Sequence, residues 1–314
     1  PADGAEAVDV ARDGSVYVAG TFAGDATLGS QEYGATGPND GYVAKFRDDG
    51  TPLWGVILSG TGVETPGGLA VDSDGTVWIA GNFSNEMEAG TRTVTAPRQE
   101  AMFLARINPD GEVEWAEAFG RGASPIVEDL VVVDGSDVVV GGSFEHEFVL
   151  DGVRHQSRGG RDGFTARFRR AEGFSWSRQV GTFEDDSVNG LAAWDERNRV
   201  LAAGVMTEPV DFGLGTTSFY GEEDAFYVEY DAFGNTKSSW SYGAQYEDAG
   251  QAVAIQAAGE PLTAGLFRLR PEQVGGDRQM FLLSGRRTAD GGPADPPPVD
   301  TGSPDTGSAD DASF

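Results

Sequence analysis

Four carboxylic acids recur in this chain of 314 residues, each 17 or 18 residues before a glycine that ends an apolar run. They are Asp3, Glu64, Asp186 and Asp248. Carboxylates gathered at one end of a channel attract cations, and their oxygens are ligands that Ca2+ prefers. A metal site is therefore one interpretation. We favour a structural role, in which each acid accepts hydrogen bonds from its own loop, because a functional site usually breaks such regularity.

Other residues with catalytic chemistry are scarce. The sequence has two histidines, His146 and His155, and no cysteine, which excludes disulfides, cysteine-ligated metals and a cysteine nucleophile. No G-x-S-x-G motif accompanies the histidines. They could bind a metal across a hairpin, but we favour exposed loop residues. Segments 72–75 and 108–111 resemble the start of a calcium loop, but they lack the later glutamate and fit hairpin turns.

The acids belong to a unit that repeats about every 61 residues. The segment SVYVAGTF at 15–22 returns as TVWIAGNF at 76–83, DVVVGGSF at 137–144, RVLAAGVM at 199–206 and EPLTAGLF at 260–267. We call the shared glycine of these segments the anchor glycine. It stands at Gly20, Gly81, Gly142, Gly204 and Gly265. A fixed period of this size indicates one supersecondary unit used five times.

Each full unit contains four short segments with the composition of β-strands. In the first unit they cover 6–11, 15–22, 41–46 and 52–58, and they are rich in β-branched and aromatic residues. Asp-Gly pairs at 13–14 and 49–50 join neighbouring segments, which is typical of tight hairpin turns. No segment has a sustained apolar period of 3.6 residues, so we expect an all-β protein with almost no helix.

Apolar residues on both faces of several strands indicate that the sheets lie between neighbours. The runs LVVV at 130–133 and VVV at 138–140 are examples. Four-stranded sheets that pack face to face around an axis are the blades of a β-propeller. We therefore predict a β-propeller of about five blades, whose last blade is incomplete because the fifth unit lacks the tryptophan strand of the others. The units cover about 1–60, 61–120, 121–181, 182–243 and 244–288.

The units resemble the bacterial SBBP-type β-propeller repeat. The matching pattern is an apolar strand, a turn, a V-Y-V-x-G strand, a D-[AG]-F-V-A-K-[FL] strand and a tryptophan strand that ends in glycine. The first unit matches at 7–22, 40–46 and 54–60, and the second at 68–83 and 102–120. The resemblance covers residues 1 to about 285. It implies a secreted or surface propeller protein.

Composition separates the repeats from a tail at 289–314. The tail is rich in Pro, Gly, Ser and Thr, and 290–314 holds six aspartates and no Lys or Arg, so we expect a disordered acidic linker. The whole chain has a formal net charge of −29. This charge argues against nucleic acid and anionic membrane surfaces as partners. No apolar run is long enough to span a bilayer, so we expect no membrane insertion.

Variable segments follow the second strand of each unit, and variable loops on a rigid scaffold often carry binding specificity. They cover 23–39, 84–100, 145–161, 207–223 and 268–277. Their aromatic residues are candidates for a contact surface, although packing against the outer edges of the blades explains them equally well. These residues are Tyr33, Phe148, Phe212, Phe219 and Tyr220.

The sequence as a whole favours a non-catalytic, exported β-propeller that binds a protein or a glycan through its loop face. The linker and the resemblance point to an extracellular location or a bacterial cell surface. We expect no enzyme activity and no cofactor, because no catalytic group is assembled. One alternative is a cation-dependent hydrolase or lyase at an acidic channel mouth, with Ca2+ as the ion. A second alternative is a structural appendage or spacer subunit.

Overall fold

The computed structural model describes residues 3–120, 124–243, 246–256, 261–268 and 278–284. These residues confirm an all-β protein, since their only helical element is a short 3-10 turn at Asp195–Arg197. No helix in these ranges could cross a membrane. The predicted tail at 289–314 and positions 269–277 of the last variable segment lie outside the described residues.

Each repeat forms one set of antiparallel strands, and we call these sets sheets 1 to 5 in chain order, although a pairing between the first two joins them into one eight-stranded sheet. Sheet 1 contains β1 (Gly4–Val10), β2 (Val16–Phe22), β5 (Asp40–Phe46) and β6 (Pro52–Gly60). Sheet 2 contains β7 (Glu64–Val71), β8 (Val77–Ala89), β9 (Arg92–Ile107) and β10 (Val113–Phe119). Sheet 3 contains β11 (Ile126–Val133), β12 (Asp137–Phe144), β15 (Asp162–Arg169) and β16 (Gly173–Val180).

Sheet 4 repeats this order and sheet 5 has three strands in the described residues. Sheet 4 contains β17 (Ser187–Trp194), β18 (Arg199–Met206), β19 (Asp224–Asp231) and β20 (Thr236–Tyr242). Sheet 5 contains β21 (Asp248–Ile255), β22 (Pro261–Arg268) and β23 (Arg278–Ser284). The strands predicted in the first unit agree with β1, β2, β5 and β6 to within two residues at each end.

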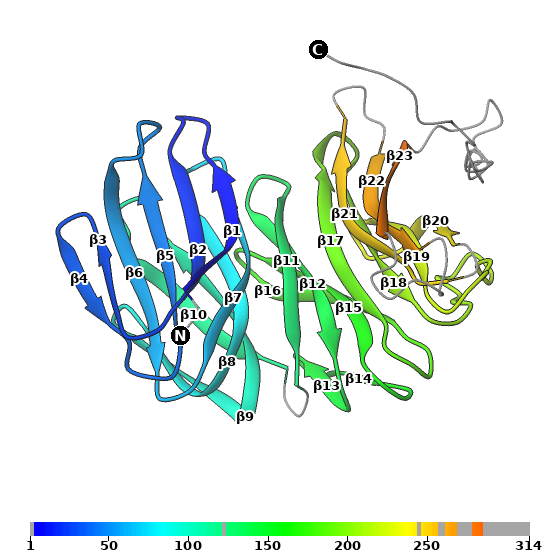
Figure 1. The fold of residues 1–314 in the computed structure, drawn as a ribbon, viewed down its shortest axis with the longest axis horizontal. Coiled ribbons are helices and arrows are strands. Elements are labelled where there is room, and N and C mark those ends of the chain that lie inside the picture. The colour runs from blue at the N-terminus through cyan, green and yellow to red at the C-terminus, as the bar shows by residue number, and fades with distance from the viewer. Residues whose placement is uncertain (1–2, 121–123, 244–245, 257–260, 269–277, 285–314) are drawn as a thin grey trace, which may run out of the picture.

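The five sheets form a row in which the first strands lie on the inside. β1 packs on β7, β7 on β11, β11 on β17, and β17 on β21. Sheets 1 and 5 stand at the two ends of the row, and the described strands do not close into a ring (Figure 1). The order of the strands within each sheet therefore matches the prediction, while closure of a propeller is not seen.

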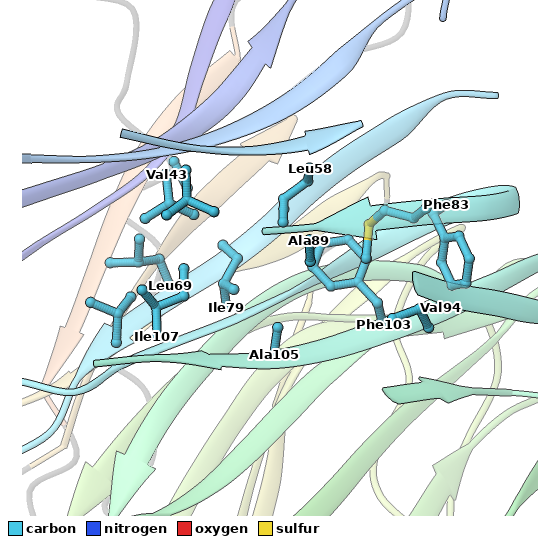
Figure 2. Packing of buried hydrophobic residues seen from close by; sticks show 14 of the residues in the cluster. Val43, Leu58, Leu69, Ile79, Phe83, Ala89, Val94, Phe103, Ala105 and Ile107 are labelled. Carbon is cyan, nitrogen blue, oxygen red and sulfur yellow. The ribbon is translucent and has the colours of Figure 1, made fainter. Parts of the chain in front are cut away.

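Apolar side chains fill the junctions between successive sheets. Val43 and Leu58 of sheet 1 face Leu69, Ile79 and Phe103 of sheet 2 (Figure 2). Similar clusters fill the junctions between sheets 2 and 3, 3 and 4, and 4 and 5. Burial of each such side chain contributes about 1.5–3 kcal/mol. Because an inner sheet is covered on both faces, its strands need apolar residues at consecutive positions.

The anchor glycine is required because the first strand of each sheet approaches it very closely. Opposite this glycine, the pairing of the first strand with the second shifts by one residue in all five sheets, which is a β-bulge. A Cβ atom on Gly142 would overlap the carbonyl oxygen of Ile126. Gly204 has the same relation to Ser187. Any side chain at the anchor position would push the first strand out of the sheet.

In sheets 1 and 3 the tryptophan of the fourth strand joins that strand to the following sheet. The indole N–H of Trp54 donates to the carbonyl of Pro109 at 3.0 Å, and that of Trp176 donates to Ala232 at 3.0 Å. Both carbonyls lie in a turn between the third and fourth strands. In the first of these turns, Gly111 has a φ of 89°, and a Cβ there would come within 2.9 Å of the Trp54 ring.

The variable segments are more regular than the sequence analysis expected. Segment 23–39 contains a hairpin of β3 (Asp25–Leu28) and β4 (Gln31–Gly34), and segment 145–161 contains one of β13 (Glu147–Leu150) and β14 (Val153–Gln156). Segment 84–100 is not a loop, because β8 and β9 continue through it and β8 also pairs with β6. Its alternation predicts this extension, since Met87, Ala89, Val94 and Ala96 are buried and most residues between them are exposed.

Most aromatic residues of the variable segments pack against their own sheet and do not form a contact surface. Phe148 is fully buried against Phe144 and Phe164. Phe212 packs on Phe226 with ring centroids 5.2 Å apart. Tyr33 donates to the carbonyl of Gly55 at 3.5 Å, and Phe219 packs against the core between sheets 3 and 4. Among the five, Tyr220 is the exposed one.

Replacement of an anchor glycine should destabilise the protein. The change Gly142→Ala forces a methyl group against the carbonyl of Ile126, and overpacking of this kind costs about 1–3 kcal/mol. Urea unfolding followed by tryptophan fluorescence measures the loss. The matched control is Gly34→Ala in β4, whose Cβ would meet only Asp25 at an ordinary 3.5 Å. Equal stabilities of the two variants would contradict the role given to the bulge.

Candidate functional site between sheets 3, 4 and 5

The β-bulge of each first strand adds one residue that has no partner on the second strand. These residues are Glu6, Gly67, Glu128, Asn189 and Gln251. Bulges commonly redirect a side chain and are frequent beside active sites. Glu128, Asn189 and Gln251 line one pocket. The sequence analysis did not select this position, although it precedes each anchor glycine by 14 or 15 residues.

The pocket lies between sheets 3, 4 and 5, where their first strands begin, and has a volume of about 410 Å3. Its wall includes residues of β11, β17 and β21 and of the connections that precede β15 and β19. Carboxylic acids dominate its charged groups. They are Glu128, Asp185, Asp186, Glu223 and Glu247. A concave site with acids from several strands can transfer protons and can bind hydroxyl groups or cations.

Arg161 is the one cation among the residues that line this pocket. Its guanidinium donates to the Ser143 hydroxyl at 3.0 Å and to the carbonyl of Ser124 at 2.6 Å. It also pairs with Glu145 at 3.3 Å. These contacts hold the guanidinium beside Glu128. Desolvation in the pocket wall raises the pKa of Glu128, and the charge of Arg161 opposes that rise. Glu128 therefore keeps its proton to a higher pH than an ordinary glutamate.

Polar groups on the other side of the pocket are fixed by bonds between sheets 4 and 5. The side-chain amide of Asn189 donates from Nδ2 to the backbone carbonyl of Gly250 at 2.9 Å, and its Oδ1 accepts from the Ser187 hydroxyl at 2.6 Å. An isolated parallel β-bridge between Glu223 and Glu247 brings the backbone before β19 alongside the backbone before β21. The pocket thus combines Glu128, whose pKa is raised, with the neighbouring acids Glu223 and Glu247. The side chains of Asn189 and Ser187 are held in place by hydrogen bonds.

The structure brings the four acids selected from the sequence into separate local contacts. Asp3 accepts a hydrogen bond from the amide of Ala23 at 3.0 Å. The other three are buried where one sheet meets the next, and each pairs with an aspartate that begins the third strand of the preceding sheet. The pairs are Asp40 with Glu64, Asp162 with Asp186, and Asp224 with Asp248. The sequence analysis missed these partners, although each stands 24 residues before its acid.

The backbone holds the members of each pair together. The amides of Glu64, Asp186 and Asp248 donate to the residue just before the partner aspartate at 3.2, 2.8 and 2.9 Å. Asp186 also accepts bonds from the amides of Thr182 and Thr207 at 2.6 and 2.9 Å. Within the described residues, no group of three or more His, Asp or Glu side chains could hold a metal ion. The Ca2+ site stays a prediction.

The junction between sheets 2 and 3 has no acid pair and uses an amide in its place. Ala101 and Pro125 occupy the positions of the two acids. Here Asn82 donates to the carbonyl of Pro125 and accepts from the amide of Val127 at 2.8 Å. Both members of the pair are therefore replaced together, which indicates that they act as a unit.

Burial keeps the acid pairs partly protonated near neutral pH. Desolvation, followed by the charge of Asp40, raises the pKa of Glu64 to about 8. Desolvation likewise raises the pKa of Asp186 and of Asp224 to about 6, with the partner aspartate adding to the rise in each case. The side chain of Glu64 has no exposed surface, and neither of its oxygens has a hydrogen-bond partner in the described residues.

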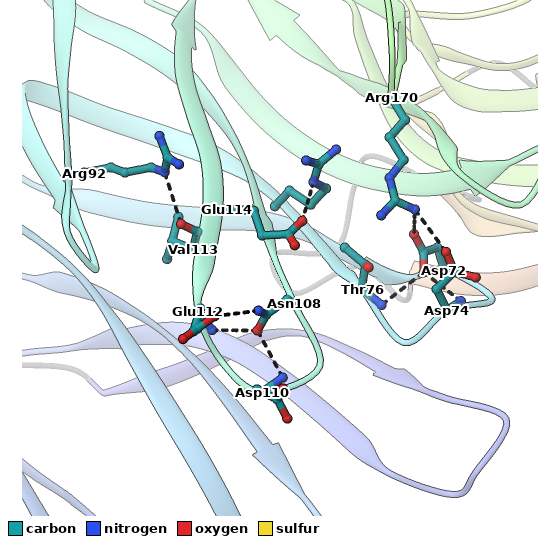
Figure 3. A network of polar contacts seen from close by, with 11 residues as sticks. Asp72, Asp74, Thr76, Arg92, Asn108, Asp110, Glu112, Val113, Glu114 and Arg170 are labelled. Carbon is teal, nitrogen blue, oxygen red and sulfur yellow. Dashed lines mark hydrogen bonds and ion pairs between the residues drawn. The ribbon is translucent and has the colours of Figure 1, made fainter.

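The two histidines and the calcium-like segments serve local structure. The hairpin of β13 and β14 pairs His155 with Phe148, and the ring of His155 contacts the Ser177 hydroxyl at 2.6 Å. The side chain of His146 is 79% exposed. In the 72–75 turn, Asp72 accepts bonds from two amides and pairs with Arg170 of sheet 3 at 3.1 Å (Figure 3). Figure 3 shows the same kind of turn at 108–111.

Comparisons with known proteins found similarity among solved structures only. No family profile and no curated protein matches the sequence. A xylan β-1,4-xylosidase from Bacillus halodurans is 13% identical, with a TM-score of 0.42 over 93% of this chain and 55% of that one. A GH43_1 enzyme from Xanthomonas citri is 12% identical, with a TM-score of 0.41 over 93% and 90%. A GH43 endo-arabinanase from Bacillus licheniformis is 10% identical, with a TM-score of 0.34 over 91% and 95%.

These comparisons correct one expectation from the sequence. We predicted a non-catalytic scaffold that binds a protein or a glycan, with no enzyme activity. The comparisons run against that prediction, since all three of these structures are glycoside hydrolases. The chain spans about half the length of the xylosidase chain. At 10–13% identity the similarity concerns the fold, so the substrates and catalytic residues of those enzymes are not transferred.

Stability should fall as the pH rises from about 5 to 8. The folded protein keeps a proton on Glu64 up to about pH 8, whereas the unfolded chain releases it near the ordinary value of 4.5. Stability from this proton is therefore complete below the lower value and is lost as the pH approaches the higher one. The change Glu64→Gln should flatten the decline by up to about 1.4 kcal/mol per pH unit, the slope due to one proton.

Urea unfolding at a series of pH values measures this slope. The control Glu32→Gln alters an exposed glutamate of β4 and should leave the slope unchanged. The same pH dependence in the Glu64→Gln variant and the wild type would show that Glu64 does not hold the proton.

Proposed function

We propose that this protein is a hydrolase of glycosidic bonds, with its active site in the pocket between sheets 3, 4 and 5. The observation that carries the proposal is the position of Glu128. It sits on a β-bulge and lines a concave site with part of its side chain exposed to solvent, and partial desolvation there raises its pKa. Hydrolysis of a glycosidic bond needs a carboxylic acid that is still protonated to donate to the leaving oxygen, and a second carboxylate on the other side of the sugar.

The roles follow from the arrangement of the acids. Glu128 acts as the general acid, and Arg161 beside it limits how far its pKa rises. Glu223 and Glu247, which meet on the side of the pocket formed by sheets 4 and 5, supply the second carboxylate. Their distance from Glu128 in the complex with substrate decides whether this carboxylate attacks the sugar directly or activates a water.

The uncharged wall of the pocket suits a substrate rich in hydroxyl groups. Ser143, Ser187, Asn189 and Gln251 provide donors and acceptors from three sheets. Specific sugar binding depends on a few such groups placed by the scaffold. The fixed bonds of Asn189 and Ser187 supply that placement.

For the fold, we infer about five blades of the β-propeller type, of the SBBP-type repeat, which form an open row in one copy and of which the last is incomplete. Support comes from the sheets that share one strand order and from first strands that line the inside of the row. In this row the pocket lies on the inside, where the first strands of sheets 3, 4 and 5 begin. The hydrolase alternative placed its site at an acidic channel mouth, and of the four acids chosen there Asp186 lines this pocket.

The change Glu128→Gln should abolish hydrolysis of unactivated glycans while leaving activated substrates cleavable. Loss of a general acid lowers the rate on the order of 100-fold or more. Dinitrophenyl glycosides have a leaving group that needs no proton, so their hydrolysis should change far less. Release of reducing sugar from a panel of xylans, arabinans and glucans, and release of dinitrophenol, measure the two rates.

The control variant is Glu32→Gln, which should match the wild type on both kinds of substrate. A wild-type protein that is inactive on the whole panel would overturn the proposal. Equal losses on glycans and on dinitrophenyl glycosides would remove Glu128 from the role of general acid.

A further inference from the structure

Each sheet of the row has two faces that play different parts. We call the face that packs on the preceding sheet the leading face, and the face that packs on the following sheet the trailing face. Four junctions in this chain are formed by a trailing face against a leading face. The leading face of sheet 1 and the trailing face of sheet 5 have no sheet against them in the described residues.

The leading face of sheet 1 carries an apolar residue that is buried everywhere else. Val8 on β1 is 65% exposed. The residues that hold the same register in the other first strands are Leu69, Leu130, Leu191 and Val253, with exposures of 6, 2, 5 and 8%. Burial at this position is thus the rule within the chain, and sheet 1 is the exception.

The neighbouring positions on this face show the same contrast. Val18, Tyr42 and Phe46 of sheet 1 are half-buried, whereas their counterparts in sheet 2 are fully buried. These counterparts are Ile79, Phe103 and Ile107. A pocket of about 410 Å3 lies over the face and is lined by Val18, Phe22, Tyr42 and Phe46 among others. The sheet therefore presents an apolar, hollowed surface of the kind that marks an interaction site.

The trailing face of sheet 5 is uncovered in the same way. Met280 on β23 is 85% exposed, while the residues in its register on sheets 2 and 4, Met102 and Ala225, have no exposed surface. Leu262 and Ala264 of β22 are half-buried. Their counterparts in sheets 2 and 4 are 2% exposed or less, namely Trp78, Ala80, Leu201 and Ala203.

We propose that the leading face of sheet 1 binds the trailing face of sheet 5 in a second copy of this chain. The two surfaces are the unmatched halves of a junction that the chain builds four times, so their contact continues an interface already present. They stand at opposite ends of the row (Figure 1), which favours a contact between molecules over one within a molecule. The contact is head to tail, and each copy retains one free end for a further copy.

The charge of the protein sets the conditions for this contact. A formal net charge of −29 on each copy opposes association at low ionic strength, and salt screens the repulsion. The apolar contact itself does not depend on salt in this way. Association should therefore strengthen between about 0.05 and 0.5 M NaCl, opposite to the behaviour of a contact held by ion pairs.

Sedimentation velocity of the full chain at concentrations between about 1 and 200 μM tests the proposal, since this range detects micromolar dissociation constants. The wild type should form species of two or more copies as the concentration rises. The variants Val8→Asp and Met280→Asp each place a charge on one end face and should raise the dissociation constant at least tenfold. The control Val153→Asp alters a residue of β14 that is 42% exposed and should associate like the wild type.

Mixing the two end variants gives the sharper result. Val8→Asp keeps an intact trailing face and Met280→Asp an intact leading face, so each alone should be monomeric and their mixture should form dimers and nothing larger. Circular dichroism checks that each variant is folded. A wild type that stays monomeric, because the ring closes within one molecule or because the faces bind another partner, would overturn the proposal. Variants that still dimerise alone would overturn it as well.

Discussion

The close approach of the first strand to the anchor glycine is the constraint on which the rest of the structure depends. Only a residue without a Cβ allows the carbonyl of the bulged strand to lie over the second strand. The bulge then adds one residue that the second strand does not pair. In sheets 3, 4 and 5 that residue is Glu128, Asn189 or Gln251, and each lines the same pocket. The bulge, which repeats for structural reasons, thus also positions the three side chains that differ between sheets and line the pocket.

Interactions between neighbouring sheets stabilise the row. Apolar clusters fill every junction, and polar links at their rims fix the angle between sheets. The Trp54 and Trp176 indoles reach a turn of the next sheet, and buried acid pairs or Asn82 join the other end. A buried pair of carboxyl groups is stable only when it holds a proton, so the raised pKa of Glu64 ties the junction to pH.

The sequence predicts the repeat, the strands and the turns because these follow from local rules. Asp-Gly turns, apolar runs and the tryptophan position all depend on nearby residues. The acid pairs could not be found from one member alone, because Asp40 and Glu64 meet only when two sheets pack. The bulge is invisible as a local pattern, so Glu128 was not selected. For the aromatic residues of the variable segments, the sequence could not decide between a contact surface and packing against the blade edges. It does not show onto which face of a sheet a hairpin folds.

The candidate site in the pocket could not be found from the sequence for a related physical reason. Repetition of an acid in nearly every unit favours a structural role for those acids, and it directs attention away from repeated positions at which the residue type changes. The pocket instead combines residues at one repeated position that differ from unit to unit, Glu128, Asn189 and Gln251, with Arg161 from a connection. Departures from the repeat, compared at equivalent positions, carry the information about function.

Sheets in this row are stabilised by their neighbours, so sheet 3, which is covered on both faces, is held more firmly than sheet 1. Native-state hydrogen exchange on dilute protein measures this directly, because amide protection reports local opening. The account predicts the slowest exchange in β12, around Gly142, and faster exchange in β2, around Gly20, by at least tenfold. Equal protection of β2 and β12 in the monomer would contradict it.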